Sequence, residues 1–112
     1  MTSRKILVVD DNKVLRKKLS AILRPHYALR TACDGAEALK SVDEAIPDLV
    51  ITDVLMPNMN GWEFVRTLRT RPKVALLPVI FLTTQSSSAD LMRGFQLGAD
   101  DYLEKPVSGT VL

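Results

Sequence analysis

The chain has 112 residues, a formal net charge of +2 and an ordinary share of hydrophobic residues, 46%. This length suits one domain, spanning residues 1–112, around a single core. No apolar run approaches the ~20 residues needed to cross a membrane, and the charge is too small to imply direct nucleic-acid binding. The single cysteine, Cys33, cannot form an internal disulfide, which favours a reducing, cytoplasmic location.

The first third of the chain predicts a strand, a helix and a second strand. Residues 5–9 are a short apolar run after one lysine, which is typical of a buried strand. From Asn12, leucine and isoleucine recur at helical spacing, with lysine and arginine on the other faces, until Pro25 ends the pattern. Residues 28–32 predict the second strand, which is weaker because Arg30 interrupts it.

The middle of the chain repeats this alternation. A helix opens at Gly35 and carries an apolar stripe that extends to Ile46, where Pro47 closes it. Residues 49–53 predict a third strand that is apolar enough to be covered on both faces. After a loop that ends at Gly61, a third helix is expected, broken by an Arg-Pro-Lys sequence.

The last third predicts two further strands, at residues 79–83 and 101–104, with a helix between them that Gly98 caps. Only six residues follow Pro106, so a fifth helix would be incomplete, and either the domain is cut here or more chain follows. Five strand-helix units with short connections predict an α/β fold with a doubly wound parallel sheet and helices on both faces.

Three carboxylates follow two of these strands: Asp10 and Asp11 end the first, and Asp53 ends the third. The carboxyl ends of parallel strands share one edge, where open α/β proteins bind ligands. Three acids there cannot all stay ionised without a counter-charge, so they indicate a divalent cation. Lys105, after the fifth strand, supplies the fixed positive charge that a transferred phosphoryl group needs.

The order and spacing of these pieces resemble the response-regulator receiver domain of two-component signalling, the family of the bacterial chemotaxis response regulator. The resemblance covers essentially the whole chain and implies a flavodoxin-like five-stranded parallel sheet of order 2-1-3-4-5. It rests on Val8-Val9-Asp10-Asp11-Asn12, on Asp53 with Met56-Pro57 and Gly61, on Thr83-Thr84, and on Asp101-Tyr102-Leu103-Glu104-Lys105-Pro106.

The resemblance implies that Asp53 is a carboxylate nucleophile that takes a phosphoryl group from a phosphohistidine. Asp11 and Asp53 would hold Mg²⁺ directly, with the main-chain carbonyl of Leu55 as a third ligand, and Asp10 would act through a water. Magnesium suits such a site because it prefers few protein oxygens and keeps several waters.

The resemblance also implies a switch. Thr83 and Lys105 would each contact a phosphoryl oxygen, and Tyr102 would turn inward as Thr83 moves, remaking the surface around the fourth helix and fifth strand. Leu55 and Gln85 occupy the two positions whose side chains, in the family, control the approach of water to the phosphorus. Neither orients water well, which predicts a longer-lived phosphoryl state.

The implied phosphodonor is a sensor histidine kinase or a histidine phosphotransfer protein. A C-terminal effector domain or partner and a phosphorylation-dependent homodimer are further expectations. The chain would catalyse only its own phosphorylation and dephosphorylation, not the conversion of an external substrate.

Three other functions compete with this interpretation. A metal-dependent aspartyl phosphatase needs a second acid two residues after its nucleophile, where this chain has Leu55. A flavin-binding flavodoxin-like protein would want a phosphate loop rich in serine, threonine and glycine after the first strand, where Asp10 and Asp11 would repel a phosphate unless a metal intervened. A receiver-shaped scaffold that acts without phosphorylation stays open.

Overall fold

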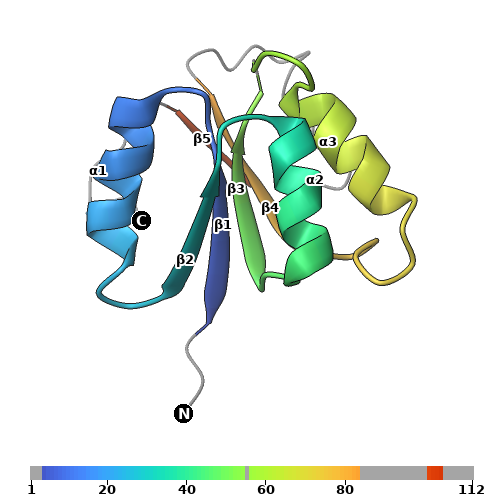
Figure 1. Cartoon of the computed structure of the whole chain (residues 1–112), viewed down its shortest axis with the longest axis horizontal. Helices are drawn as coiled ribbons and strands as arrows, with labels where there is room; N and C mark the ends of the chain where they lie inside the picture. Colours follow the sequence, from blue (N-terminus) through green and yellow to red (C-terminus); the bar gives the residue numbers. More distant parts are fainter. Residues whose placement is uncertain (1–3, 55, 84–100, 105–112) are drawn as a thin grey trace.

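The computed structural model describes residues 4–54, 56–83 and 101–104. Strands and helices alternate along the chain (Figure 1), and the strands begin and end at the residues that the sequence predicts. The elements are β1 (Lys5–Val9), α1 (Lys13–Leu23), β2 (Ala28–Ala32), α2 (Gly35–Glu44), β3 (Leu49–Asp53), α3 (Gly61–Arg69), β4 (Val79–Thr83) and β5 (Asp101–Glu104).

The strands form a parallel sheet in which β1 lies between β2 and β3. β4 pairs with β3 on one side and with β5 on the other, again in parallel. Figure 1 shows α1 on one face of the sheet and α2 with α3 on the other. The expected α/β class, with a parallel sheet covered on both faces, is confirmed. The predicted fourth helix and the incomplete fifth helix lie outside the described residues.

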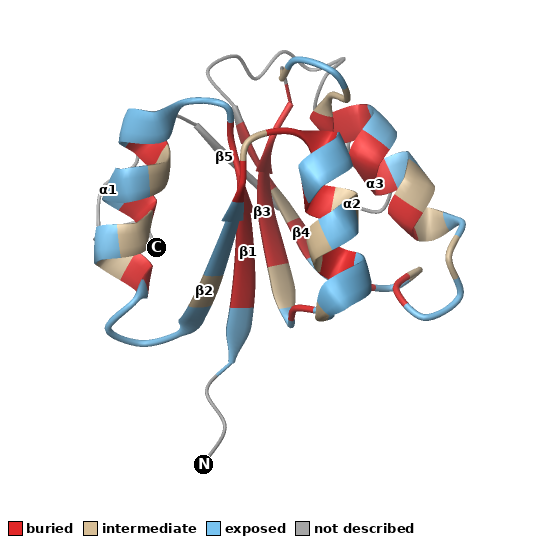
Figure 2. Cartoon of the chain, viewed as in Figure 1, coloured by how far each residue is buried: buried red, intermediate tan, exposed pale blue. Residues whose placement is uncertain are grey.

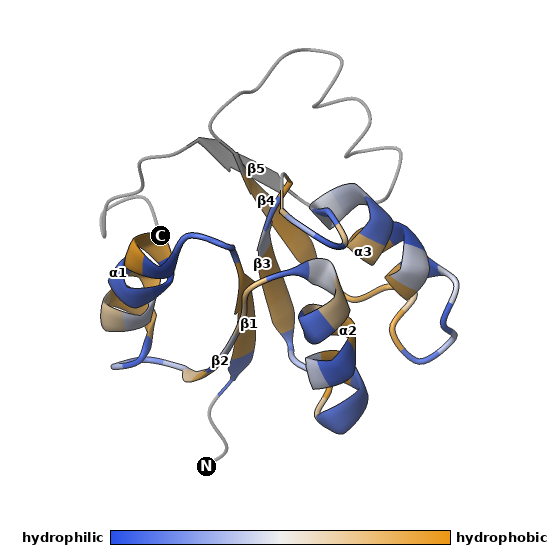
Figure 3. Ribbon diagram, turned by 45° about the horizontal axis from the view of Figure 1, so that its top comes forward, coloured by the Kyte–Doolittle hydropathy of each residue, from blue (hydrophilic) through white to orange (hydrophobic). Residues whose placement is uncertain are grey.

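Each face of the sheet has its own core, because successive side chains of a strand point to opposite faces. Ile6 and Val8 of β1 pack against α1, whereas Leu7 and Val9 belong to the core beneath α2 and α3. Figure 2 shows buried residues along the middle strands and on the inner sides of the helices, and Figure 3 shows hydrophobic residues in the same strands. Within the described ranges, no helix has the length and apolar character that a membrane crossing requires.

A polar side chain starts each described helix, satisfying N–H groups that have no partner within the helix. Asn12 accepts from the first turn of α1, and Asp34 accepts from the Glu37 N–H of α2. Asn60 and Glu63 form a reciprocal capping box at α3. The helix starts and the loops that lead to them therefore lie at the carboxyl edge of the sheet, beside the strand ends.

One predicted boundary is wrong. The apolar stripe was expected to run to Ile46, but α2 ends at Glu44, the backbone of Ala45 is extended, and Ile46 is 47% exposed. Pro47 accounts for the exclusion of Ile46 from the helix, because the residue before a proline is driven out of the helical conformation.

Candidate functional site

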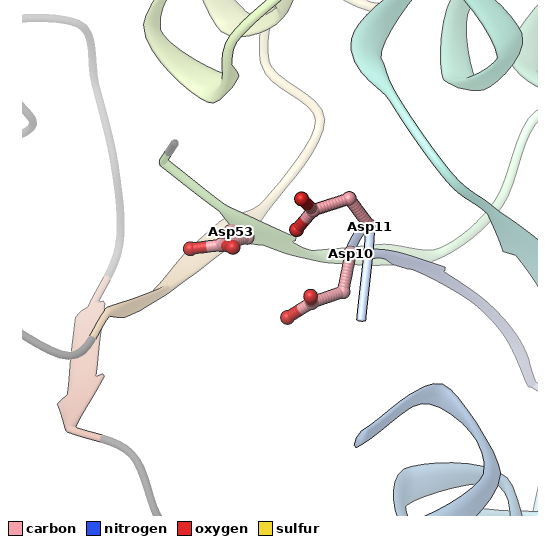
Figure 4. A group of neighbouring side chains, drawn as sticks. All are labelled: Asp10, Asp11 and Asp53. Carbon is pink, nitrogen blue, oxygen red and sulfur yellow. The ribbon is translucent and has the colours of Figure 1, made fainter. Parts of the chain in front are cut away.

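The three carboxylates that follow β1 and β3 converge at the carboxyl edge of the sheet. The register places Val9 opposite Thr52, so Asp10 and Asp53 are the next residues on neighbouring strands. One carboxylate oxygen from each of Asp10, Asp11 and Asp53 lies within 4.8 Å of the other two. Figure 4 shows Asp10 and Asp11 extending from the end of β1 beside Asp53. The parallel sheet therefore builds a compact cluster of acidic oxygens.

Asp10 is held in place by its neighbours and is 1% exposed. Its backbone N–H donates to the Ala32 carbonyl at 3.0 Å, which extends the pairing of β1 with β2 by one residue. Its Oδ1 accepts from the Asn12 N–H at 2.8 Å, and its carbonyl oxygen accepts from Nη1 of Arg16 at 2.6 Å. Backbone and side chain are thus both fixed at the start of α1.

Lys13, Arg16, Lys17 and Lys18 lie on the faces of α1 away from its apolar stripe, where solvated side chains are expected, but Arg16 departs from this expectation. Arg16 is half-buried and reaches back over the first turn of α1 to the carbonyl of Asp10. The other three side chains are exposed, as expected. No periodic signal distinguishes Arg16, because the contact depends on how α1 leaves β1.

Asp53 is also nearly enclosed, at 8% exposure. Its Oδ1 accepts from the N–H of Val54 at 2.7 Å, and its carbonyl oxygen accepts from the Thr52 hydroxyl at 2.9 Å. The Val54 carbonyl accepts in turn from the Gly61 N–H at 2.8 Å, which ties the end of β3 to the start of α3. The carboxylate is therefore presented from a well-anchored backbone.

The donor set of the cluster fits a hard divalent cation. Carboxylate oxygens are preferred Mg²⁺ ligands, and magnesium needs only one or two carboxylates together with waters. Asp11 is exposed whereas Asp10 and Asp53 are buried, so the cluster combines enclosed oxygens with one side accessible to solvent. A dication placed there would offset the repulsion among the three negative charges.

The structure places the other predicted site residues only in part. Thr83 is the last residue of β4, one position beyond the residue that pairs with Asp53, and Tyr102 lies in β5 opposite Phe81. Their backbones thus belong to strands that end at the same edge, but their side chains are not described. Leu55 and Lys105 lie outside the described residues, as does Gln85.

A second polar cluster joins the loop after β3 to the first turn of α2. Nδ2 of Asn58 donates to Oδ2 of Asp34 at 2.8 Å, and the Gly35 N–H donates to the Met59 carbonyl at 3.0 Å. The Glu37 N–H, followed by the Asn58 amide, holds the pKa of Asp34 below its ordinary value. Sequence reasoning missed this cluster. The Asp-x-x-Glu pattern at Asp34 signals a helix start, but nothing local signals Asn58, 24 residues away.

Comparison with known proteins identifies the family. Residues 6–112 match the model of the response regulator receiver domain. The alkaline phosphatase synthesis transcriptional regulatory protein PhoP of Bacillus subtilis is 40% identical over 107 residues, which are 95% of this chain and 44% of PhoP. A probable cyclic di-GMP phosphodiesterase of Vibrio cholerae is 40% identical over 103 residues, 92% of this chain and 23% of that protein.

Solved structures agree with this assignment. The chemotaxis protein CheY4 of Vibrio cholerae has a TM-score of 0.93 and 36% identity, and the match covers 97% of this chain and 92% of CheY4. The chain spans less than half the length of the curated relatives named above. It belongs to the response regulator receiver domain family, the phosphoacceptor modules of two-component signalling proteins.

Proposed function

We propose that Asp53 is the phosphoacceptor of this receiver domain. The observation that carries the proposal is the convergence of its carboxylate with those of Asp10 and Asp11 at the carboxyl edge of the sheet. A carboxylate oxygen of Asp53 attacks the phosphorus of a phosphohistidine on the partner protein. An O–P bond forms as the N–P bond breaks, and the imidazole nitrogen keeps the electron pair and takes up a proton.

Asp11 and Asp53 would hold Mg²⁺ directly, together with the main-chain carbonyl of Leu55, and Asp10 would act through a water. The bound ion would supply positive charge opposite the phosphoryl oxygens, where charge is concentrated during transfer. The contribution of the chain itself is placement. Hydrogen bonds from Asn12 to Asp10 and from Val54 to Asp53 hold one oxygen of each carboxylate and orient the group.

The proposal extends to the complete receiver fold, with strand order 2-1-3-4-5 and two further helices. Thr83 and Lys105 would contact phosphoryl oxygens, and Tyr102 would respond to the movement of Thr83. Phosphorylation adds negative charge and acceptor oxygens at the end of β3. Thr83 lies at the end of the neighbouring strand, and these oxygens would attract its hydroxyl group. The surface around the fourth helix and β5 would then carry the signal.

The phosphodonor would be a sensor histidine kinase or a histidine phosphotransfer protein in the cytoplasm. Relatives named as a transcriptional regulatory protein and as a probable phosphodiesterase are longer than this chain, which supports an effector domain or effector partner. Phosphorylation-dependent dimerisation belongs to the same proposal. The chemistry of the chain would be confined to its own phosphorylation and dephosphorylation.

The test is phosphorylation by acetyl phosphate with Mg²⁺, followed by mass spectrometry of the intact protein. Asp53→Asn should abolish the phosphorylated species, because an amide is a poor nucleophile. Asp48→Asn is the matched control, since this exposed acid precedes the opposite end of the same strand, and it should be phosphorylated as the parent is. Full phosphorylation of Asp53→Asn would refute the assignment, and a parent that takes no phosphate would favour the scaffold alternative.

A further inference from the structure

The loop of residues 54–60 leads from Asp53 to α3, and both of its ends are fastened. At its start, the Val54 carbonyl accepts from the Gly61 N–H at 2.8 Å. At its end, the Asn60 side chain accepts from the Glu63 N–H at 2.9 Å in the capping box of α3. These contacts lie within the β3–α3 connection, so they fix the ends of the loop but not its tip.

The tip of the loop is held by a different element, the first turn of α2. The Gly35 N–H donates to the Met59 carbonyl. A Cβ on Gly35 would lie 2.7 Å from Cγ and 2.8 Å from the carbonyl oxygen of Met59, so only glycine permits this approach. Beside this contact, Nδ2 of Asn58 donates to Oδ2 of Asp34 at 2.8 Å. Two adjacent hydrogen bonds therefore join the loop tip to the start of α2.

The burial of Asp34 and the backbone conformation of Asn58 both favour a stable hydrogen bond between them. Asp34 is 8% exposed, and its two oxygens have separate partners, with Oδ1 accepting from the Glu37 N–H at 2.8 Å. A bond to an ionised carboxylate is stronger than one between neutral groups. Asn58 has a φ of 66°, the only positive value among the described non-glycine residues, and asparagine tolerates this conformation better than most.

We infer that Asp34 is a positioning residue for the cation site, holding the tip of the loop after Asp53 through the side chain of Asn58. Oδ1 of Asp34 accepts the hydrogen bond that caps α2, whereas Oδ2 accepts the hydrogen bond from Asn58 in the loop. The loop has to be held because it begins directly after Asp53 and includes the proposed carbonyl ligand Leu55. This inference rests on the proposed function, since it assumes that Mg²⁺ binds beside Asp53.

The test uses Asp34→Asn and Asn58→Gly. Asparagine caps helices about as well as aspartate. In Asp34→Asn, however, the atom that faces Asn58 becomes an amide donor, so the Asn58 amide has to turn over and the bond to an ionised carboxylate is lost. Asn58→Gly removes the donor while keeping a residue suited to positive φ. Each variant should raise the Mg²⁺ dissociation constant about tenfold, measured by calorimetry without a phosphodonor, because residues that orient ligands typically contribute on this scale.

The double variant Asp34→Asn with Asn58→Asp reverses donor and acceptor and should restore magnesium affinity to within about threefold of the parent. Parent-like affinity in both single variants would overturn the inference, even if their stability to urea changed, because the pair would then be purely structural. A double variant as weak as Asp34→Asn would overturn it as well. A parent that binds no Mg²⁺ would instead refute the proposed metal site, and the inference with it.

Discussion

Gly61 packs directly against Asp53: a Cβ at position 61 would overlap the carbonyl oxygen of Asp53. The Gly61 N–H also donates to the carbonyl of Val54 at 2.8 Å. The first residue of α3 is therefore joined to the backbone that carries the proposed phosphoacceptor. A shift at the start of α3 would have to move the end of β3.

Gly61→Ala should destabilise the protein by about 1–3 kcal/mol, because the added methyl group forces the backbone at Asp53 to move. The direction of this change tests the close packing, because replacing glycine by alanine at a helical position with room for the methyl group stabilises a protein by about 0.4–1 kcal/mol. Urea unfolding measures the change. Arg66→Ala, on the exposed side of α3, is the control and should stay within about 0.5 kcal/mol of the parent. A Gly61→Ala variant more stable than the parent would show that the close packing is relieved without cost.

Asp11→Ala should weaken magnesium binding, because one of the three converging carboxylates is lost. A ligand that binds only the folded state raises its stability in proportion to RT ln(1 + [L]/Kd). We therefore expect added Mg²⁺ to raise the thermal midpoint of the parent clearly and that of Asp11→Ala much less. Asp43→Ala removes an acid from the exposed side of α2 and should respond as the parent does. Equal midpoint shifts in the parent and Asp11→Ala would contradict the site.

The depressed pKa of Asp34 predicts a pH dependence of stability. The Glu37 N–H, followed by the Asn58 amide, favours the ionised carboxylate, so its pKa lies below the ordinary 3.8. A group with a depressed folded pKa adds stability above its unfolded pKa, and this stability is lost as the pH falls through the folded value. The stability advantage of the parent over Asp34→Asn should thus be constant near neutral pH and shrink below 3.8.

Urea unfolding of both proteins at a series of pH values measures this difference, because most other ionisable groups are shared and their contributions cancel. An advantage that stayed constant well below the ordinary pKa of Asp34, or grew there, would contradict the prediction.

Leu19→Ala should cost about 2–5 kcal/mol of unfolding free energy, because Leu19 is fully buried between α1 and the sheet and its truncation leaves a cavity. Lys18→Ala changes the adjacent, exposed position and should have little effect. Urea unfolding compares the two variants. A loss below about 1 kcal/mol in Leu19→Ala would show that α1 is not packed tightly on this face.

Leu55→Asn should speed the loss of the phosphoryl group, because a polar side chain two residues past Asp53 can orient the attacking water and leucine cannot. The decay of the phosphorylated protein is followed by mass spectrometry after removal of the donor, with Mg²⁺ present. Leu76→Asn makes the same chemical change at a position that is 94% exposed and should leave the decay unchanged. An unchanged or slower decay in Leu55→Asn would refute its role as a guard.

Local patterns predicted the acids at the strand ends, but their convergence depended on which strands are neighbours, and the end of α2 was misplaced. The strands are short apolar runs, and the carboxyl ends of neighbouring parallel strands meet at one edge, so Asp10 and Asp53 were expected together once β1 and β3 were neighbours. The prediction that β1 and β3 are adjacent came from the family resemblance. Periodicity placed Ile46 in α2, but the conformational restriction before Pro47 outweighed the hydrophobic stripe.

The sequence by itself determined the strands, the α/β class and the acids at the strand ends, because each depends on periodicity or on position relative to a strand end. Only the tertiary structure decided that Arg16 holds the carbonyl of Asp10 and that Asn58 donates to Asp34. These contacts join side chains to atoms that no repeat spacing relates, and their geometry arises only when α1, α2 and the loop after β3 pack around the finished sheet.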